Sequence, residues 1–230
     1  MYLIYSLLFI TVLSLFFTSA IRKNSKTFYS IASIIALGTI IHEIFRLVSD
    51  TKFQGLIFDF EKASMKGNFS IAFFVLVMFA GALNAKWSIT KKLLSIRAES
   101  AILGSILILP HAIMYLVRFI VKLINNKPIS ALYIIYLIVG VIAFIIMIPL
   151  FITSLKKFRS KMKYIEWKKL QRLAYPFYFL TYMHIVLALL NDNEVDILKL
   201  SVYSVLFISY FILKLIKTHK KNKYVNIKSI

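Results

Sequence analysis

The sequence predicts an all-α membrane protein, a polytopic bundle of about seven transmembrane helices. Hydrophobic residues make up 60% of the 230-residue chain, and its mean hydropathy is +0.81. Apolar runs long enough to cross a hydrocarbon layer of roughly 30 Å recur along the whole chain. Lys and Arg lie mostly in the short segments between these runs. A soluble domain of this length could not bury so many apolar runs, so a membrane protein is the expected class.

Each expected span is an apolar run bounded by charged or turn-forming residues. The first run lacks the basic start of a signal peptide, so we expect it to be a retained helix. The expected spans are Tyr2–Ile21, Phe28–Val48, Phe69–Leu83, Ala98–Ile124, Ile129–Ser154, Leu170–Leu190 (broken by Pro176) and Ile197–Ile216. A polar loop is expected over Ser49–Asn68. We expect N-terminal helices and an outer loop at 1–68, a core at 69–217 and a basic cytoplasmic tail at 218–230.

The net charge of +20 is concentrated in particular loops. The segments after the first, third and fifth spans and the C-terminal tail carry most of the Lys and Arg. This positive-inside pattern places them and the C-terminus in the cytoplasm, with the acidic turn at 191–194 outside. The expected location is therefore a plasma membrane, the inner membrane of a bacterium. Anionic lipid is the expected partner of the basic loops, and no nucleic-acid partner is expected.

Two absences exclude classes of chemistry. The chain has no cysteine, which excludes disulfides, thiolate metal sites, iron–sulfur clusters and thiol catalysis. It also has no glycine-rich phosphate loop, so by itself it is not expected to take hydride from NAD(P)H.

Two histidines are predicted to lie at the same depth in the membrane. His111 and His184 are each about 20 Å from the inner end of their span at 1.5 Å per residue. Two histidines at one level on two helices are suited to be the axial ligands of one haem in the outer half of the bilayer. The alternative is that each histidine simply forms a hydrogen bond with a neighbouring helix.

A stripe of residues at seven-residue spacing passes through His111. Arg97, Gly104, His111 and Arg118 share one helix face, because seven residues drift only about 20° around a helix. Gly104 would let a flat ring approach the backbone. Arg118 would meet haem propionates with its planar donor fork, or snorkel to the outer interface.

A second charged cluster ends the second span. Glu43 and Arg46 are at positions i and i+3, so they are expected to pair on one helix face. His42 is either a spare ligand or quinol-site residue, or an interfacial histidine near the outer headgroups. We favour the second possibility, an interfacial position for His42.

Three motifs together resemble a known family. They are Arg97-Ala98-Glu99-Ser100-Ala101-Ile102-Leu103-Gly104 leading to His111, Pro149-Leu150 with Thr153-Ser154, and Trp167-x-x-Leu170-Gln171-Arg172-Leu173-x-Tyr175 leading to His184. Over about Phe69–Ile216 the chain resembles the ferric reductase-like transmembrane domain, nearest to the haem-binding membrane subunit of bacterial methionine-sulfoxide reductase systems. The resemblance implies a six-helix core plus one extra N-terminal helix, with electron transfer through b-type haem iron held by His111 and His184.

The chain departs from the family pattern at its second haem. Gln171 and Arg97 stand where two-haem members carry histidines. The resemblance therefore implies one haem b, at the outer site. A quinol or an unknown redox partner would donate electrons to it, and the chain would be the electron-transfer subunit of an oxidoreductase without its own flavin or NAD(P) domain. The alternative function is that of a haem-free membrane scaffold or assembly partner. A third hypothesis, a small transporter, is less well supported because the spans offer few substrate-binding groups.

Overall fold

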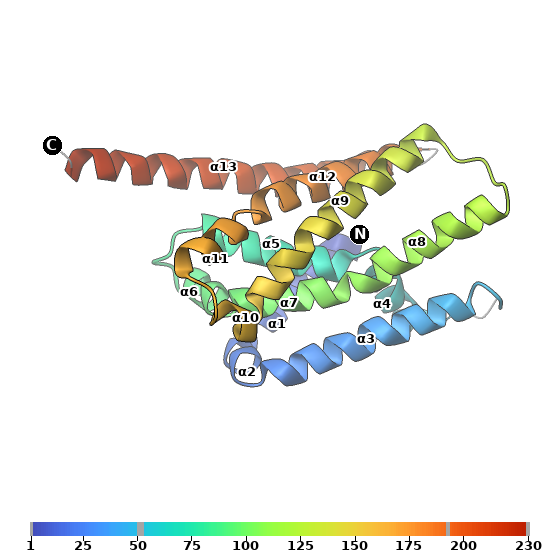
Figure 1. Cartoon of the computed structure of the whole chain (residues 1–230), viewed down its shortest axis with the longest axis horizontal. Coiled ribbons are helices and arrows are strands. Elements are labelled where there is room, and N and C mark those ends of the chain that lie inside the picture. Colours follow the sequence, from blue (N-terminus) through green and yellow to red (C-terminus); the bar gives the residue numbers. More distant parts are fainter. Residues whose placement is uncertain (1, 50–52, 192–193, 229–230) are drawn as a thin grey trace.

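The chain is a bundle of helices, seen in a computed structural model that describes residues 2–49, 53–191 and 194–228 (Figure 1). These residues contain no strand. The helices are α1 (Tyr2–Phe16), α2 (Thr18–Lys23), α3 (Ser25–Phe45), α4 (Gly55–Met65), α5 (Asn68–Ala82), α6 (Ser88–Ser95), α7 (Arg97–Leu107), α8 (Leu109–Ile124), α9 (Ala131–Ser154), α10 (Lys156–Arg159), α11 (Tyr164–Gln171), α12 (Ala174–Leu190) and α13 (Ile197–Lys228).

Five helical segments of the described chain are long and apolar enough to cross a membrane. They are α3, the continuous pair α7–α8, α9, the pair α11–α12, and α13. The pair α4–α5, bent by 58°, makes a sixth if it is counted as one span. The predicted polytopic helical bundle is therefore confirmed. The first expected span differs, because a break at Phe17 divides it into α1, which has 15 residues, and the short α2.

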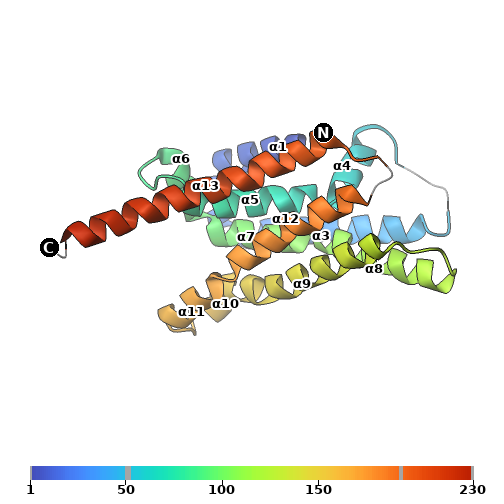
Figure 2. The same ribbon diagram turned by 90° about the horizontal axis from the view of Figure 1, so that it is seen from above.

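Helix α5 lies at the centre of the bundle. Twelve of its fifteen residues are buried, and α1, α4, α6, α7 and α13 all contact it. Figure 2 shows α5 between α1 and α13 on one side and α7 and α12 on the other. Its sequence, NFSIAFFVLVMFAGA, is apolar on every face, as expected for a helix surrounded by other helices.

The segment expected to be a polar loop contains α4, so that expectation is wrong. Helix α4 ends at Met65, and Gly67 then takes a left-handed conformation with φ of 69° before α5 begins. A side chain at this glycine would be strained by that φ and would lie 2.9 Å from the Ile108 side chain. The glycine therefore permits the sharp bend that brings α4 back against the bundle.

The sixth span is broken before Pro176, not at it. Helix α11 ends at Gln171, a turn closed by the hydrogen bond from the Leu173 N–H to the Leu170 carbonyl follows, and α12 begins at Ala174. Pro176 lies in the first turn of α12, where its missing N–H leaves no hydrogen bond unmade.

The basic segments gather at one end of the bundle. Helices α2, α6, α10 and α11 lie toward the end of the molecule that also holds the C-terminus, on the left in Figure 1. We call this the basic end. The connections α3–α4, α8–α9 and α12–α13 lie at the opposite end. Asp192 and Asn193, in the expected acidic turn, lie outside the described residues.

Two cations bind carbonyl groups near the C-terminal end of α5, and those bound by Lys217 lie in its last turn and at the residue that follows it. The Arg97 Nε donates to the Val77 carbonyl at 3.1 Å, and the Lys217 ammonium donates to the Gly81 and Leu83 carbonyls at 3.0 and 2.7 Å. The last carbonyls of a helix have no partner within the helix, and the negative end of its dipole attracts cations. Lys217 thus fixes α13 to the end of the central helix.

Replacing Lys217 by methionine should destabilise the bundle. Lys217→Met removes two charge-assisted hydrogen bonds, so we expect the free energy of unfolding to fall by about 1–3 kcal/mol. Thermal unfolding of the detergent-solubilised protein measures this loss. Lys220→Met removes an equal charge from an exposed position of the same helix and is the control. Equal unfolding temperatures for the two variants would contradict the assigned role of Lys217.

Candidate functional site

The structure brings His111 and His184 together between α8 and α12. The centroids of the two imidazole rings lie 5.9 Å apart, with an angle of 89° between the ring planes. Each ring also contacts a tyrosine: Tyr115 lies 4.5 Å from His111, and Tyr136 lies 5.7 Å from His184. The two histidines that were predicted to lie at the same depth are therefore neighbours in the structure.

His111 is oriented by the end of α4. Its Nδ1 lies 3.0 Å from the carbonyl oxygen of Met65, the last residue of that helix. This carbonyl is available because a helix leaves its last carbonyls without partners, and the bend at Gly67 stops the helix there. Gly67 also lies against His111, since a Cβ at this position would be 3.6 Å from the ring carbon Cγ.

His184 is oriented in the same manner by α9. Its Nδ1 lies 2.8 Å from the carbonyl oxygen of Tyr136, inside that helix. Gly140, one turn further along α9, makes the approach possible. A Cβ there would lie 2.7 Å from both Nδ1 and Cε1 of His184, which is closer than real Cβ contacts come. Both histidines therefore donate to a main-chain carbonyl beside a glycine.

These hydrogen bonds determine which ring nitrogen is able to bind a metal. A carbonyl oxygen only accepts, so Nδ1 carries the proton in each ring. In the neutral imidazole Nε2 then has a lone pair, and a hydrogen bond from Nδ1 to a carbonyl is the usual support of a metal-binding histidine. The chain thus presents two histidines prepared to coordinate through Nε2.

The distance between the rings suits a metal ion between them. With metal–nitrogen bonds of about 2 Å and roughly 1 Å more from each nitrogen to its ring centre, two ligands of one metal place their centroids about 6 Å apart. Among the described residues no group of three or more His, Cys, Asp or Glu could hold a metal. A pair of histidines suits an ion whose other ligands come from a macrocycle, as in haem.

Gly104 does not lie beside the histidine pair. A Cβ at this position would lie 3.1 Å from both the Phe73 Cβ and the Phe74 ring, which belong to α5. The Ser70 hydroxyl also donates to the Gly104 carbonyl at 2.7 Å. This corrects the expectation for Gly104: the missing side chain lets α7 and α5 approach one another, and it does not face a flat ring.

Arg118 is part of an ion-pair cluster at the end of the bundle opposite the basic end. Its guanidinium lies 2.5 Å from one carboxylate oxygen of Glu43, and Arg46 lies 2.6 Å from the other. The predicted pairing of Glu43 with Arg46 is confirmed. Glu43 is only 3% exposed, so two guanidinium groups compensate one buried carboxylate.

A second buried carboxylate lies close to the first. Glu61 of α4 is 5% exposed and pairs with Nδ1 of His42. The His42 ring stacks on Phe53 with a centroid distance of 3.8 Å. His42 therefore joins α3 to α4, and its bonds are with Glu61 and Phe53 instead of with the His111–His184 pair.

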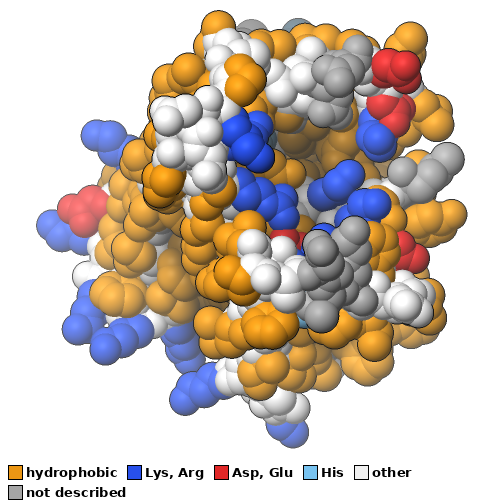
Figure 3. All heavy atoms as spheres, turned by 90° about the vertical axis from the view of Figure 1, so that its right-hand side faces the viewer, with side chains coloured by type: hydrophobic (Ala, Val, Ile, Leu, Met, Phe, Trp, Pro, Cys, Tyr) orange, Lys and Arg blue, Asp and Glu red, His pale blue; other side chains and the backbone are white. Residues whose placement is uncertain are grey.

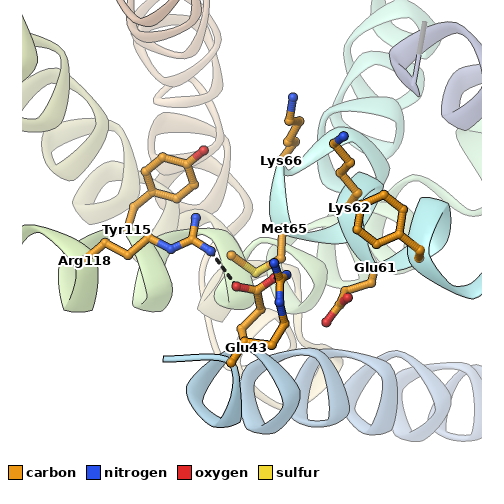
Figure 4. A pocket seen from close by; sticks show the side chains of 9 residues that line it. Glu43, Glu61, Lys62, Met65, Lys66, Tyr115 and Arg118 are labelled. Carbon is orange, nitrogen blue, oxygen red and sulfur yellow. Dashed lines mark hydrogen bonds and ion pairs between the residues drawn. The ribbon is translucent and has the colours of Figure 1, made fainter. Parts of the chain in front are cut away.

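A cavity of about 280 Å³ opens between these ion pairs. Figure 3 shows Lys and Arg side chains around a hollow at this end, with carboxylates deeper inside. Figure 4 shows Arg118 of α8 directed toward Glu43 of α3, while Lys62 of α4 and Lys66, directly after α4, extend away from that contact. The lining residues are Glu43, Arg46, Phe58, Glu61, Lys62, Met65, Lys66, Tyr115 and Arg118.

Arg97 and Gln171 line a second, smaller cavity toward the basic end, of about 40 Å³. The Gln171 amide donates to the Thr153 hydroxyl at 2.9 Å, while Arg97 binds the Val77 carbonyl. The two positions at which the family pattern has histidines therefore face one space. An arginine side chain only donates hydrogen bonds, so this space has no pair of imidazole ligands.

Sequence reasoning missed the groups that orient the two histidines. Met65 and Tyr136 act through main-chain carbonyls, which any residue would supply. Gly140 had a weak signal, as the one glycine of the expected span Ile129–Ser154. Glu61 lay in a segment taken for a loop, so its position opposite His42 could not be anticipated.

The sequence is similar to a known protein family and to one curated protein. Residues 66–182, just over half of the chain, match the family described as ferric reductase like transmembrane component. The match includes His111 and ends two residues before His184. An uncharacterised protein of Treponema pallidum (strain Nichols) is 32% identical over 161 residues, which cover 68% of this chain and 44% of that protein. The chain thus spans less than half the length of this relative. No solved structure matches.

Enlarging Gly140 should misplace His184. In Gly140→Ala the new methyl group would occupy the position of the imidazole, so we expect the hydrogen bond to the Tyr136 carbonyl to break at a cost of about 1–3 kcal/mol. Nitrogen NMR of histidine-labelled protein measures the change, because loss of the bond shifts the Nδ1 resonance of His184. Gly38→Ala is the matched control, since a Cβ at this helical glycine meets nothing within 4 Å. An unchanged resonance in Gly140→Ala would refute the role of the glycine.

Proposed function

The chain belongs to the ferric reductase-like transmembrane family, and we propose that it holds one haem b between His111 and His184 as a membrane electron-transfer subunit. Electrons would enter from a quinol or a redox partner and leave to an acceptor at the outer face. Membership of this family supports a role as a membrane protein that takes part in electron transfer. The single haem, its position and the direction of transfer are the proposal.

The main support for this proposal is that both imidazole rings are held by hydrogen bonds to main-chain carbonyls. Both Nδ1 atoms bind main-chain carbonyls, and the ring centroids are 5.9 Å apart. Here each bond leaves Nε2 as the lone-pair donor of its ring and the two rings are neighbours, which supports axial ligation of one metal by the pair.

The residues around the pair would hold and tune the cofactor. A haem bound there supplies reversible one-electron transfer at its iron. His111 and His184 would each donate a lone pair from Nε2, and the carbonyls of Met65 and Tyr136 would raise the basicity of the ligands. The guanidinium of Arg118, seven residues beyond His111, would lie toward the propionate edge, with its orientation fixed by Glu43.

The second family site would remain without haem. Arg97 and Gln171 offer a guanidinium and an amide there, and neither group replaces an imidazole as a ligand of haem iron. Electrons would therefore reach the single haem by a route other than a second haem. A quinol dissolved in the bilayer, or a partner protein, fits this requirement.

The protein should bind close to one haem per chain. We expect the purified protein, after haem supplementation, to give a b-type reduced-minus-oxidised spectrum and a haem-to-protein ratio near one. His111→Ala and His184→Ala should each lose most of the bound haem, because each removes one of two axial ligands. His219→Ala, at an exposed position of α13, is the control, and His42→Ala is compared with it because His42 pairs with Glu61 instead.

Three results would contradict this assignment. A ratio near two would require a second site, a ratio near zero would favour a haem-free scaffold, and loss of haem in His42→Ala with retention in His184→Ala would reassign the ligands. Gln171→His alone should not add a haem, because Arg97 still faces the new histidine across the cavity. Arg97→His combined with Gln171→His tests whether the smaller cavity can open for a porphyrin.

The proposed orientation places the basic end in the cytoplasm of a bacterial cell. The absence of native cysteine makes single-cysteine labelling simple. Asn125, in the α8–α9 connection, and Ser160, beside α10, are both exposed at opposite ends of the bundle. We expect a membrane-impermeant maleimide to label Asn125→Cys in intact cells and Ser160→Cys only after permeabilisation. The reverse pattern would invert the orientation.

A further inference from the structure

We propose that one anionic lipid binds at the basic end of the bundle, where Arg97, Lys214 and Lys217 would hold its phosphate group. Arg97 begins α7, and the two lysines are one turn apart on α13. The site adds a specific ligand to the general attraction between basic loops and anionic membranes. Its assignment to the cytoplasmic leaflet follows the proposed orientation, whereas binding of the lipid requires neither that orientation nor haem.

The three cations gather around Gly81, near the end of α5. The Lys217 ammonium donates to the Gly81 carbonyl at 3.0 Å. A Cβ on Gly81 would lie 3.5 Å from Nη2 of Arg97, so the guanidinium also lies against this residue. Lys214 and Arg97 are both near enough to Lys217 for their charges to repel its ammonium group. Three positive charges from two helices are therefore concentrated at the end of a third.

The ion pairs of the described residues leave these three cations without a carboxylate. Glu43, Glu61 and Asp196 are the carboxylates in those pairs, and their partners are other side chains. The main-chain carbonyls at the end of α5 supply only the partial negative charge of a helix terminus. Like charges repel more strongly where the dielectric constant is low, so an anion at this position would be stabilised.

Each cation keeps hydrogen-bond donors for a phosphate group. Arg97 binds the Val77 carbonyl through Nε, and its two terminal nitrogens form the fork that suits two phosphate oxygens. Lys217 donates to two carbonyls, and an ammonium group has three N–H bonds. Lys214 lies over the Tyr175 ring, 5.3 Å from its centroid, in a contact that uses the charge and not a hydrogen bond.

The position of the site along α13 matches the level of lipid headgroups. Lys217 is 20 residues beyond Ile197, where α13 begins, so it is roughly 30 Å along the helix at 1.5 Å per residue. The hydrocarbon core of a bilayer is also roughly 30 Å thick. A helix that enters the core near its first residue therefore brings Lys217 to the opposite boundary, where phosphate groups lie.

Exposed apolar side chains continue from the site and would contact the lipid tails. Phe179 follows Tyr175 by one turn of α12, and Phe211 precedes Lys214 by one turn of α13. These two phenylalanines are 61% and 60% exposed. A ligand with a phosphate group and acyl chains matches both the cations and this apolar surface, whereas a free phosphate ion would use the cations alone.

Native mass spectrometry of the full chain tests the proposal. The protein is purified in a neutral detergent and mixed with phosphatidylglycerol or with phosphatidylcholine that has the same acyl chains. We expect one phosphatidylglycerol to remain bound per chain under conditions that remove phosphatidylcholine, because only phosphatidylglycerol has a net negative charge. Equal retention of the two lipids would contradict a site that selects by charge.

Lys214→Gln is the main variant, because the Lys214 side chain contacts the Tyr175 ring and caps no helix. We expect it to bind phosphatidylglycerol about fivefold more weakly, and Lys214→Arg should bind it nearly as well as the unmodified protein does. Lys91→Gln and Lys169→Gln remove equal charges from exposed positions of α6 and α11 at the same end and are the controls. An equal loss in all three glutamine variants would indicate general attraction to the basic end and would overturn the site.

Thermal unfolding provides a second measurement. A ligand that binds only the folded protein raises its stability, so phosphatidylglycerol should raise the unfolding temperature of the unmodified protein and of Lys169→Gln. The rise should be smaller in Lys214→Gln. The same rise in both variants would refute the role of Lys214.

Competition with inorganic phosphate separates the two sources of the anion. Retention of phosphatidylglycerol in a large excess of phosphate supports a lipid site, because the apolar contacts belong to the lipid alone. Displacement of the lipid by an equal concentration of phosphate would assign a soluble anion and overturn the proposal. His184→Ala is measured in parallel, so failure of the haem proposal would leave this result intact.

Discussion

Two hydrogen bonds from imidazole to main-chain carbonyl organise the middle of this bundle. A histidine in hydrocarbon is unfavourable unless its N–H has an acceptor, and in a helix nearly every carbonyl is already used. The chain meets this constraint in two ways. It stops α4 at Met65, which frees a carbonyl for His111, and it places Gly140 where His184 must reach into α9. The bend between α4 and α5 and the close packing of α12 on α9 accompany these two bonds.

Two buried carboxylates at the end opposite the basic end are likewise paired with groups from neighbouring segments. Glu43 and Glu61 come from different helices, and each is compensated by cations or a histidine from neighbouring segments. Removing one partner of such a pair leaves an uncompensated buried charge, which costs far more than the pair contributes. These pairs hold α3, α4 and α8 in register around a space that remains open, so the charges position the helices without filling the cavity between them.

Sequence reasoning succeeded where hydropathy and residue chemistry decide the structure. The long apolar runs of α9 and α13, the pairing of Glu43 with Arg46, and the meeting of His111 with His184 were all expected. It failed where tertiary contacts decide. The amphipathic segment that forms α4 has Asp, Glu and Lys among its apolar residues, so it resembles a loop until the bundle covers it.

The other misplaced residue shows a similar limit. Gly104 was placed beside a cofactor because of its spacing from His111, but spacing within one helix does not say which neighbour packs on that face. Phe73 and Phe74 of α5 do so, and their positions follow from the tertiary packing. The carbonyls of Met65 and Tyr136 were invisible to sequence for another reason, since a main-chain group carries no residue signature.

The attachment of α13 to the centre of the bundle has a consequence for biosynthesis. The Val77 carbonyl receives Arg97 after only 20 further residues have been made, whereas Gly81 and Leu83 wait for Lys217, 136 and 134 residues later. Until then, water or lipid headgroups must solvate the end of α5 while the intervening helices leave the ribosome. The nascent chain therefore holds its central helix incompletely capped through most of translation, and insertion of α13 completes this end of the fold.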